Sequence, residues 1–120
     1  MIEIREINDL AQLQAYERLW SGLLAVTPGA SFFQSLDWLR AYWRHFGASQ
    51  QLRVLLVYQD GQVVGILPLV VRSSRRRWGS LRVLTYPFDH WGSFYGPLGS
   101  DPRPTLAAGL RLLLRVATHL

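Results

Sequence analysis

The chain has 120 residues, 49% of them hydrophobic and 18% charged, which excludes a disordered chain and fits one folded domain. It has no cysteine, so disulfides, thiol nucleophiles and cysteine-bound metals are excluded. All 13 basic residues are arginine and the net charge of +5 points weakly to anionic partners. No apolar run is long enough for a membrane helix and the N-terminus lacks a secretory pattern, so we expect no membrane span and a cytoplasmic location.

The N-terminal part is predicted to form a strand and then a helix. Residues 1–7 alternate between polar and apolar types, as in a short strand. Apolar residues three or four apart predict a helix over residues 9–26, which either Asn8 or Asp9 can cap. Thr27-Pro28-Gly29 is expected to end this helix.

A second helix is predicted over residues 35–46. Ser35 is a good N-cap, and an apolar stripe follows at helical spacing. Gly47 is a natural residue to end the helix. Phe32 and Phe33, just before it, are predicted to be extended.

A hairpin is predicted next. Residues 52–58 are apolar at nearly every position, which is typical of a strand buried on both faces. Asp60-Gly61 predicts a two-residue type I′ turn leading into a return strand over residues 62–72. Pro68 lies inside that strand and cannot donate a ladder hydrogen bond, so we expect a bulge or an unpaired edge position there.

The remaining residues are predicted to form a polar basic loop (73–80), a strand (81–86), a long loop (87–104) and a helix that begins near Asp101-Pro102. The expected apolar face of this helix continues to the last residue, so we expect the chain to be the N-terminal part of a longer protein. That face comprises Leu106, Leu110, Leu113, Ala117 and Leu120.

The order of elements, β-α-α-β-β-β-α, predicts an α/β (α+β) domain with a mainly antiparallel sheet. Three motifs follow the same order: F-Q-S-x-x-W from Phe33 to Trp38, D-G-x-x-x-G-x-L-P-L from Asp60 to Leu69, and Y-G-P-L from Tyr95 to Leu98. Together they resemble the first half of the GNAT acyltransferase fold, in particular CelD-like proteins and Fem-type aminoacyltransferases. The resemblance covers nearly the whole chain, 1–120, as one incomplete GNAT-like domain.

The resemblance implies an N-acyltransferase that moves an acyl group from a thioester to the amine of a small molecule, glycan or peptide. This chain would be its acceptor-side part, inactive by itself, and dimerisation through the incomplete sheet edge is possible. Family members use acyl-CoA, such as acetyl-CoA. The region 87–104 lacks the family's phosphate-loop spacing, so we expect the CoA site to lie outside this chain. The alternative is a non-catalytic GNAT-like binding module.

Three residues of the long loop are the candidate catalytic groups: Asp89, His90 and Tyr95. A carboxylate near an imidazole can tune a general base, and a tyrosine hydroxyl can donate at the mouth of a site. A polar loop also supplies Asp89 and His90 without any chemistry, and that structural interpretation is favoured. For Tyr95, a turn in the chain is an equally good explanation.

Trp38 and Trp91 are the candidate substrate-binding residues. Trp38, with Tyr42 and Trp43, could line an acceptor pocket, although aromatic residues at helical spacing are more often core. Trp91 could stack on a sugar or a base, and a hydrophobic plug beneath the loop is the favoured alternative. The three histidines lack ligand spacing, so no metal site is predicted.

A basic run, Arg75-Arg76-Arg77, precedes Trp78. It could bind phosphates with the tryptophan stacking on a base. A solvated loop is the favoured interpretation, which makes nucleic acid an unlikely class of partner.

Overall fold

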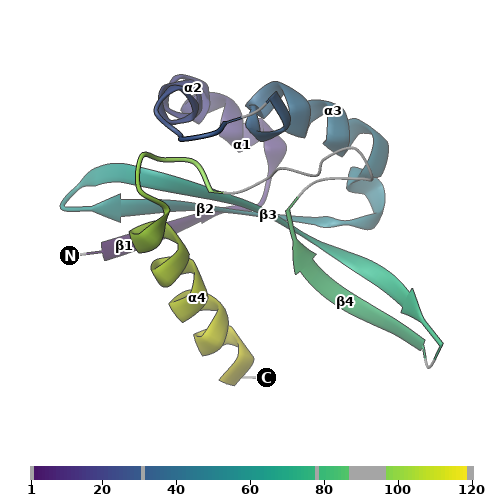
Figure 1. Ribbon diagram of the computed structural model, residues 1–120. Coiled ribbons are helices and arrows are strands. Elements are labelled where there is room, and N and C mark those ends of the chain that lie inside the picture. The colour runs from purple at the N-terminus through teal and green to yellow at the C-terminus, as the bar shows by residue number, and fades with distance from the viewer. Residues whose placement is uncertain (1, 31, 78, 87–96, 119–120) are drawn as a thin grey trace.

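A four-stranded antiparallel sheet separates two layers of helix in the computed structural model, which describes residues 2–30, 32–77, 79–86 and 97–118 (Figure 1). The strands follow one another in the sheet in the order β1-β2-β3-β4. Helices α1, α2 and α3 cover one face and α4 crosses the other. The α+β class is therefore confirmed. The elements are β1 (Ile2–Ile7), α1 (Leu10–Leu13), η1 (Gln14–Tyr16), α2 (Glu17–Ala25), η2 (Phe32–Gln34), α3 (Leu36–Phe46), η3 (Gly47–Ser49), β2 (Gln51–Gln59), β3 (Gln62–Arg76), β4 (Gly79–Thr85) and α4 (Pro102–Thr118).

The helix predicted over residues 9–26 is interrupted. Asp9 caps it as expected, since its Oδ1 accepts a hydrogen bond of 3.0 Å from the amide of Ala11. The backbone then tightens into the 3₁₀ turn η1 before α2 begins. At this turn the Tyr16 hydroxyl accepts a hydrogen bond of 3.1 Å from Arg5 on β1, which ties the interruption to the edge of the sheet.

Helix α3 begins as predicted, because Ser35 Oγ accepts a hydrogen bond of 3.1 Å from the amide of Trp38. One expectation beside it was wrong, because Phe32–Gln34 forms a 3₁₀ turn and is not extended. Gly47 ends α3 as predicted, with a φ of −65°. Packing also opposes a side chain at this position: a Cβ there would lie 2.7 Å from the Trp43 indole ring.

The β2–β3 hairpin is confirmed. Asp60 and Gly61 have φ angles of 52° and 82°, the two positive values that a type I′ turn requires. Strand β2 is buried on both faces, as its apolar run predicted. The face towards α1–α3 holds the larger core. The face towards α4 holds a smaller group, here called the Leu55 cluster: Leu55, Leu67 and Leu69 with Ile4, Leu84, Tyr86 and Leu112.

On the side of β3 that faces away from β2, Pro68 lies between two pairing partners, Leu98 before it and β4 after it. The bulge of the hairpin is elsewhere, between Val57 and Tyr58 of β2. Ile66 exchanges two backbone hydrogen bonds with Leu98, of 3.1 and 2.8 Å, on the side of β3 away from β2. Alternate residues face the same side, so the Pro68 nitrogen also points there. Pairing with β4 starts only at Val70, so among the described residues no strand pairs with Pro68 on that side, as an unpaired position requires.

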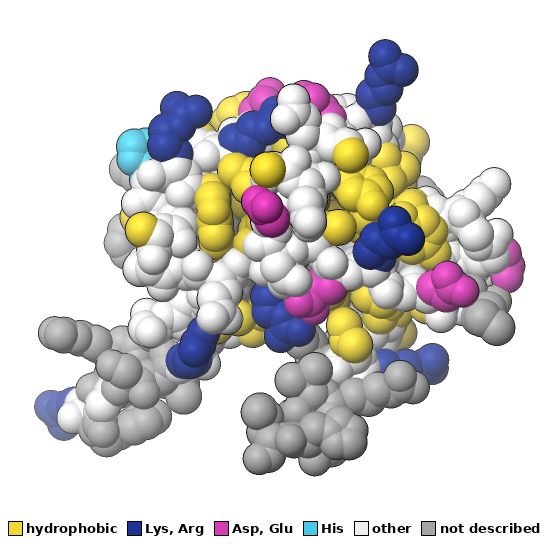
Figure 2. Space-filling model, turned by 180° about the vertical axis from the view of Figure 1, so that it is seen from behind, with side chains coloured by type: hydrophobic (Ala, Val, Ile, Leu, Met, Phe, Trp, Pro, Cys, Tyr) yellow, Lys and Arg dark blue, Asp and Glu magenta, His cyan; other side chains and the backbone are white. Residues whose placement is uncertain are grey.

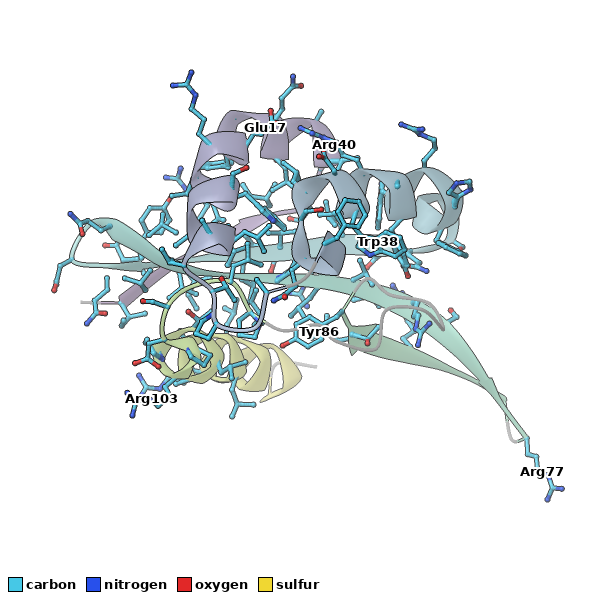
Figure 3. All side chains as sticks on the ribbon, turned by 45° about the horizontal axis from the view of Figure 1, so that its top comes forward. Glu17, Trp38, Arg40, Arg77, Tyr86 and Arg103 are labelled. Atoms are coloured by element: carbon cyan, nitrogen blue, oxygen red, sulfur yellow. The ribbon has the colours of Figure 1, made fainter. Side chains whose placement is uncertain are left out.

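The basic loop predicted over residues 73–80 was wrong. Strand β3 continues to Arg76, and β4 begins at Gly79. Pairing with β2 stops at Val71, so beyond this point β3 pairs only with β4. The two strands leave the sheet as a projecting ribbon, residues 72–83, here called the arginine ribbon (Figure 1). Arg77 lies at its tip (Figure 3).

Helix α4 begins at Pro102 after Asp101, as predicted, but buries a different face. Leu106 and Leu110 are 44% and 59% exposed. The buried side consists of Thr105, Ala108 and Gly109, whose small size lets the helix lie close to the sheet. No helix within the described ranges is both long enough and apolar enough to cross a membrane.

Candidate functional site

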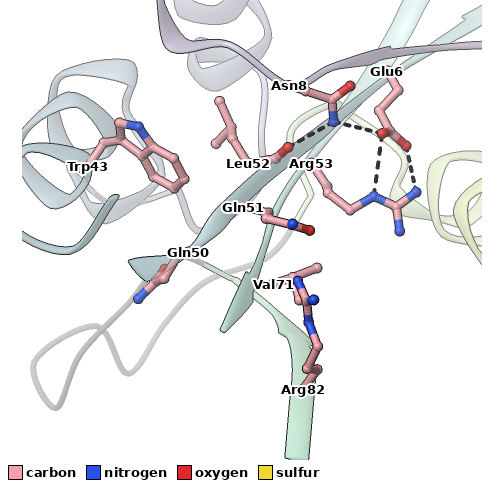
Figure 4. A pocket seen from close by; sticks show the side chains of 9 residues that line it. All are labelled: Glu6, Asn8, Trp43, Gln50, Gln51, Leu52, Arg53, Val71 and Arg82. Atoms are coloured by element: carbon pink, nitrogen blue, oxygen red, sulfur yellow. Dashed lines mark hydrogen bonds and ion pairs between the residues drawn. The ribbon is translucent and has the colours of Figure 1, made fainter. Parts of the chain in front are cut away.

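A cleft of about 700 Å³ lies at the end of the sheet beside α3 (Figure 4). Each strand contributes one side chain to its floor: Glu6 from β1, Arg53 from β2, Val71 from β3 and Arg82 from β4. The rest of the lining comes from α3, from the start of β2 and from the residue after β1, namely Trp43, Gln50, Gln51, Leu52 and Asn8.

The four floor residues share one face of the sheet because side chains alternate along a strand. Each lies two positions from a member of the Leu55 cluster on its own strand, and so on the side that α4 crosses. Helix α4 packs on the cluster itself through residues such as Leu112. The floor of the cleft is therefore a mainly polar continuation of an apolar sheet face.

Glu6 and Arg53 form a cross-strand ion pair in this floor. Arg53 Nη2 lies 2.7 Å from Glu6 Oε1, and its Nε donates a longer hydrogen bond of 3.4 Å to Oε2. The pair is diagonal, because Glu6 lies directly opposite Leu55 in the register. Asn8 fixes the carboxylate from the other side: its Nδ2 donates to Glu6 Oε2 at 2.7 Å and to the Leu52 carbonyl at 2.9 Å.

This network determines the protonation state of Glu6. Partial burial opposes ionisation, but the hydrogen bonds from Arg53 and Asn8 outweigh it and hold the pKa of Glu6 below its ordinary value. A carboxylate with a lowered pKa is a weaker base. Glu6 is therefore suited to hold and orient polar groups, and is poorly suited to remove a proton from an amine.

The opposite wall presents an aromatic ring and amide groups. Trp43 is half-buried and packs on the larger core. The Tyr42 hydroxyl donates a 2.9 Å hydrogen bond to Gln50 Oε1, which fixes the Gln50 amide and leaves its NH₂ group as a donor. Gln51 is exposed at the same wall.

Arg82 adds a cation to the floor. Its side chain is exposed, and within the described parts of the chain no carboxylate forms an ion pair with it. Donor groups thus outnumber acceptors around the cleft, and an indole lies beside them. Such a lining suits a small polar molecule with oxygen-rich or anionic groups.

Five site residues were predicted from the sequence, and of these only Trp38 lies in the described part of the chain. It is half-buried, packs on the larger core and meets Phe32 edge to face at 6.3 Å between ring centroids. It does not line the cleft, whereas Trp43, weighed with it, does. Asp89, His90, Trp91 and Tyr95 lie outside the described residues.

The Glu6–Arg53–Asn8 network was missed from the sequence. One signal was present: Arg53 is the single charged residue in the otherwise apolar run of 52–58. A charge in a strand buried on both faces needs a partner, and the partner had to come from a neighbouring strand. The identity of that neighbour depends on the register, which the sequence did not supply.

The start of α4 does not fit the pyrophosphate of CoA. A helix start binds phosphate through free backbone N–H groups. Here Asp101 Oδ1 already accepts a 3.1 Å hydrogen bond from the amide of Arg103, and its carboxylate also pairs with the Arg103 guanidinium at 3.0 Å. Pro102 and Pro104 have no N–H to donate. A carboxylate therefore occupies the position that a phosphate would need.

The described residues contain no group of three or more histidine, aspartate or glutamate side chains placed to hold a metal ion. Comparisons with known proteins give no relative: no protein-family model, no curated protein and no solved structure matches the chain.

Proposed function

We propose that the chain is the acceptor-side part of a GNAT-type N-acyltransferase, which transfers an acyl group from a thioester to an amine. The observation that carries this proposal is the contact between two of the three motifs. Leu98 of Y-G-P-L pairs with Ile66 of the hairpin motif through two backbone hydrogen bonds. Motifs that resemble one family in order also pack together here, as parts of one functional unit would.

One further contact links the same region to the helices, and another links the third motif to α2. The amide of Gly99 donates a 2.9 Å hydrogen bond to Thr27 Oγ1 at the end of α2. Gln34, in the F-Q-S motif, is buried, and its carbonyl accepts a 2.9 Å hydrogen bond from the Trp20 indole. The arrangement of helices on both faces of an antiparallel sheet is also compatible with the expected order of elements.

The cleft floored by Glu6 and Arg53 is our candidate for the acceptor site. Catalysis of this type depends chiefly on holding amine and thioester together in the correct geometry. The Glu6–Arg53 pair and the Gln50 and Gln51 amides would orient the polar groups of the acceptor. In this proposal the proton acceptor is Asp89 or His90, with Tyr95 as a hydroxyl donor, while Glu6 is held in its ion pair with Arg53.

The thioester site is assigned to residues other than the start of α4, since Asp101 occupies that position.

The test is an acyl-transfer assay on protein expressed from its complete reading frame. Acetyl-CoA and longer acyl-CoAs are supplied with a panel of amino sugars, amino acids and short peptides, and release of the CoA thiol is measured. Turnover with at least one pair is expected. A folded protein that releases no thiol with any pair would refute the proposal.

A matched pair of variants tests the acceptor cleft. Gln51→Ala removes an exposed amide from the cleft, whereas Gln59→Ala removes the same group from the opposite end of β2. Loss of one hydrogen bond, worth about 1 kcal/mol, should raise the KM for the amine about fivefold in Gln51→Ala only. Equal KM values in both variants would place the acceptor elsewhere. If the Asp89→Ala or the Tyr95→Phe variant transfers acyl groups at the wild-type rate, the role proposed for that residue is wrong.

A non-catalytic binding module is the second candidate. It is favoured by the exposed Leu106 and Leu110 on α4, which give the helix an apolar outer side. Acceptor binding by calorimetry without any thiol release would support this alternative.

A further inference from the structure

The net charge of the molecule is concentrated on the arginine ribbon. Five of the 13 basic residues fall between residues 72 and 82, and no acidic residue occurs between Asp60 and Asp89. The eight other arginines are matched in number by the eight acidic residues of the chain. The charge of +5 therefore equals the charge of the ribbon, while the remainder of the molecule is neutral.

The ribbon lies beyond the part of β3 that pairs with β2. Pairing with β2 ends at Val71, so the ribbon is covered by no other strand of the sheet. Of its described side chains, Ser73, Arg77 and Arg82 are exposed and Arg72 is half-buried. Neither Arg77 nor Arg82 forms an ion pair with a carboxylate in the described ranges. Seen from behind, basic side chains are visible both at this end and on the body of the molecule, whereas the visible acidic side chains lie on the body alone (Figure 2).

We propose that the arginine ribbon is a binding arm for double-stranded DNA. A two-stranded antiparallel ribbon fits the major groove of B-form DNA, which is about 12 Å wide. Arginine pairs with phosphate through a planar fork of donors, and one ribbon without carboxylates places several such groups along a short length of backbone. The five paired positions from Arg72 to Arg76 extend over about 17 Å, at about 3.4 Å per residue.

The same charge would also attract an anionic membrane. A membrane surface is usually bound by a broad face with apolar side chains that enter the lipid. The ribbon is only two strands wide, narrower than such a face. This width favours a groove over a flat lipid surface.

This inference does not depend on the acyltransferase proposal. It also revises the earlier interpretation of Arg75–Arg77 as a solvated loop, because these residues lie on or beside paired strands.

The test is fluorescence anisotropy with a labelled 20-base-pair DNA duplex from 50 to 200 mM KCl. If about four of the five ribbon arginines contact phosphates, the logarithm of the binding constant should fall with the logarithm of the salt concentration at a slope near −3.6. This slope is about a hundredfold loss of affinity over this range. Arg77→Ala with Arg82→Ala should reduce the slope by about 2 units. Arg77→Ala alone, which leaves the cleft intact, should reduce it by about 1 unit.

The matched control is Arg18→Ala with Arg44→Ala, two exposed arginines on α2 and α3 whose removal lowers the net charge equally. This control should bind the duplex as the unaltered protein does. An equal loss in both double variants would show that only total charge matters and would overturn the proposal.

Two further probes separate the partners. A-form RNA has a narrow major groove, so an RNA duplex should bind at least tenfold more weakly, and equal binding would refute insertion of the ribbon into a groove. Vesicles containing 25% anionic phospholipid test the membrane alternative. Binding to vesicles but not to DNA, or no salt-dependent binding to DNA, would overturn the inference. Circular dichroism verifies that every variant is folded.

Discussion

Thr105 on α4 lies against Gly65 on β3 so closely that a Cβ on the glycine would overlap the threonine side chain. The same Cβ would lie 3.0 Å from the Leu98 carbonyl. Gly65 also sits in the hairpin motif, beside the bulge of β2 and β3. A missing side chain therefore lets the helix, the bulge and the Y-G-P-L motif meet at one point.

Gly65→Ala should lower the free energy of unfolding by about 2 kcal/mol, because a methyl group must be forced into a filled site. Urea denaturation would measure it. Gly22→Ala is the control: nothing lies within 4 Å of its Cβ position on α2. It should raise stability by about 0.5–1 kcal/mol through better helix propensity. Equal effects would mean that α4 does not contact β3 at this point.

Thr105→Val should leave stability unchanged or raise it by up to about 1 kcal/mol. The Thr105 hydroxyl is fully buried and has no hydrogen-bond partner among the residues that the structure describes, so an isosteric methyl group removes an unsatisfied polar atom. Thr105→Ser retains the hydroxyl and deletes the methyl group, and should lower stability by about 1 kcal/mol. If valine destabilised the protein more than serine does, the hydroxyl would have a partner in solution.

Glu6→Gln should lower stability at pH 7 by about 1 kcal/mol, since it leaves Arg53 half-buried without its anion. The pKa of Glu6 is lowered in the folded state, so its contribution is complete above the unfolded pKa of about 4.3. It is lost as the pH falls through the folded pKa. The stabilities of the two proteins should therefore approach each other as the pH falls below the ordinary glutamate value of about 4.3, and coincide once Glu6 is protonated in the folded state.

The control for this prediction is Glu17→Gln, which removes an exposed carboxylate paired with Arg40 at 3.3 Å. Exposed pairs contribute little, so its stability should change by less than about 0.5 kcal/mol. A Glu6→Gln difference that stays constant from pH 7 to pH 2.5 would contradict the role of the charge.

Leu110→Gln should change the free energy of unfolding by less than about 0.5 kcal/mol, because the side chain is 59% exposed on the outer side of α4. Leu67→Ala, in the Leu55 cluster beneath Gly109, should cost about 3 kcal/mol. A large loss in Leu110→Gln would show that the helix presents its other face to the sheet.

Local signals predicted local structure well. Ser35 marks the start of α3 because its own side chain makes the capping bond. Asp60-Gly61 marks the hairpin because few residue pairs tolerate two positive φ angles. In both cases the physical cause lies within three residues of the signal, so no knowledge of the rest of the fold was required.

Features determined by distant contacts were not predictable. On α4 the leucines form a regular stripe, yet the helix turns Thr105 and Gly109 inwards, because Gly65 on β3 leaves space that only small residues can enter. The Glu6–Arg53 pair depends on strand register. Residues 73–80 were predicted to be a loop because they are mainly polar. A strand is recognised from polar and apolar residues in alternation, and this segment does not alternate.

On the side away from β2, strand β3 pairs first with Leu98 and then with β4, and Pro68 lies between these two pairings. A proline at such a junction has no amide proton to leave unsatisfied when the neighbouring chain diverges. The gap between Leu98 and β4 therefore leaves no backbone donor of Pro68 without a partner. Because Leu69–Val71 still pair with β2 beyond it, the sheet stays continuous up to the base of the ribbon, and the ribbon projects from a fixed foundation.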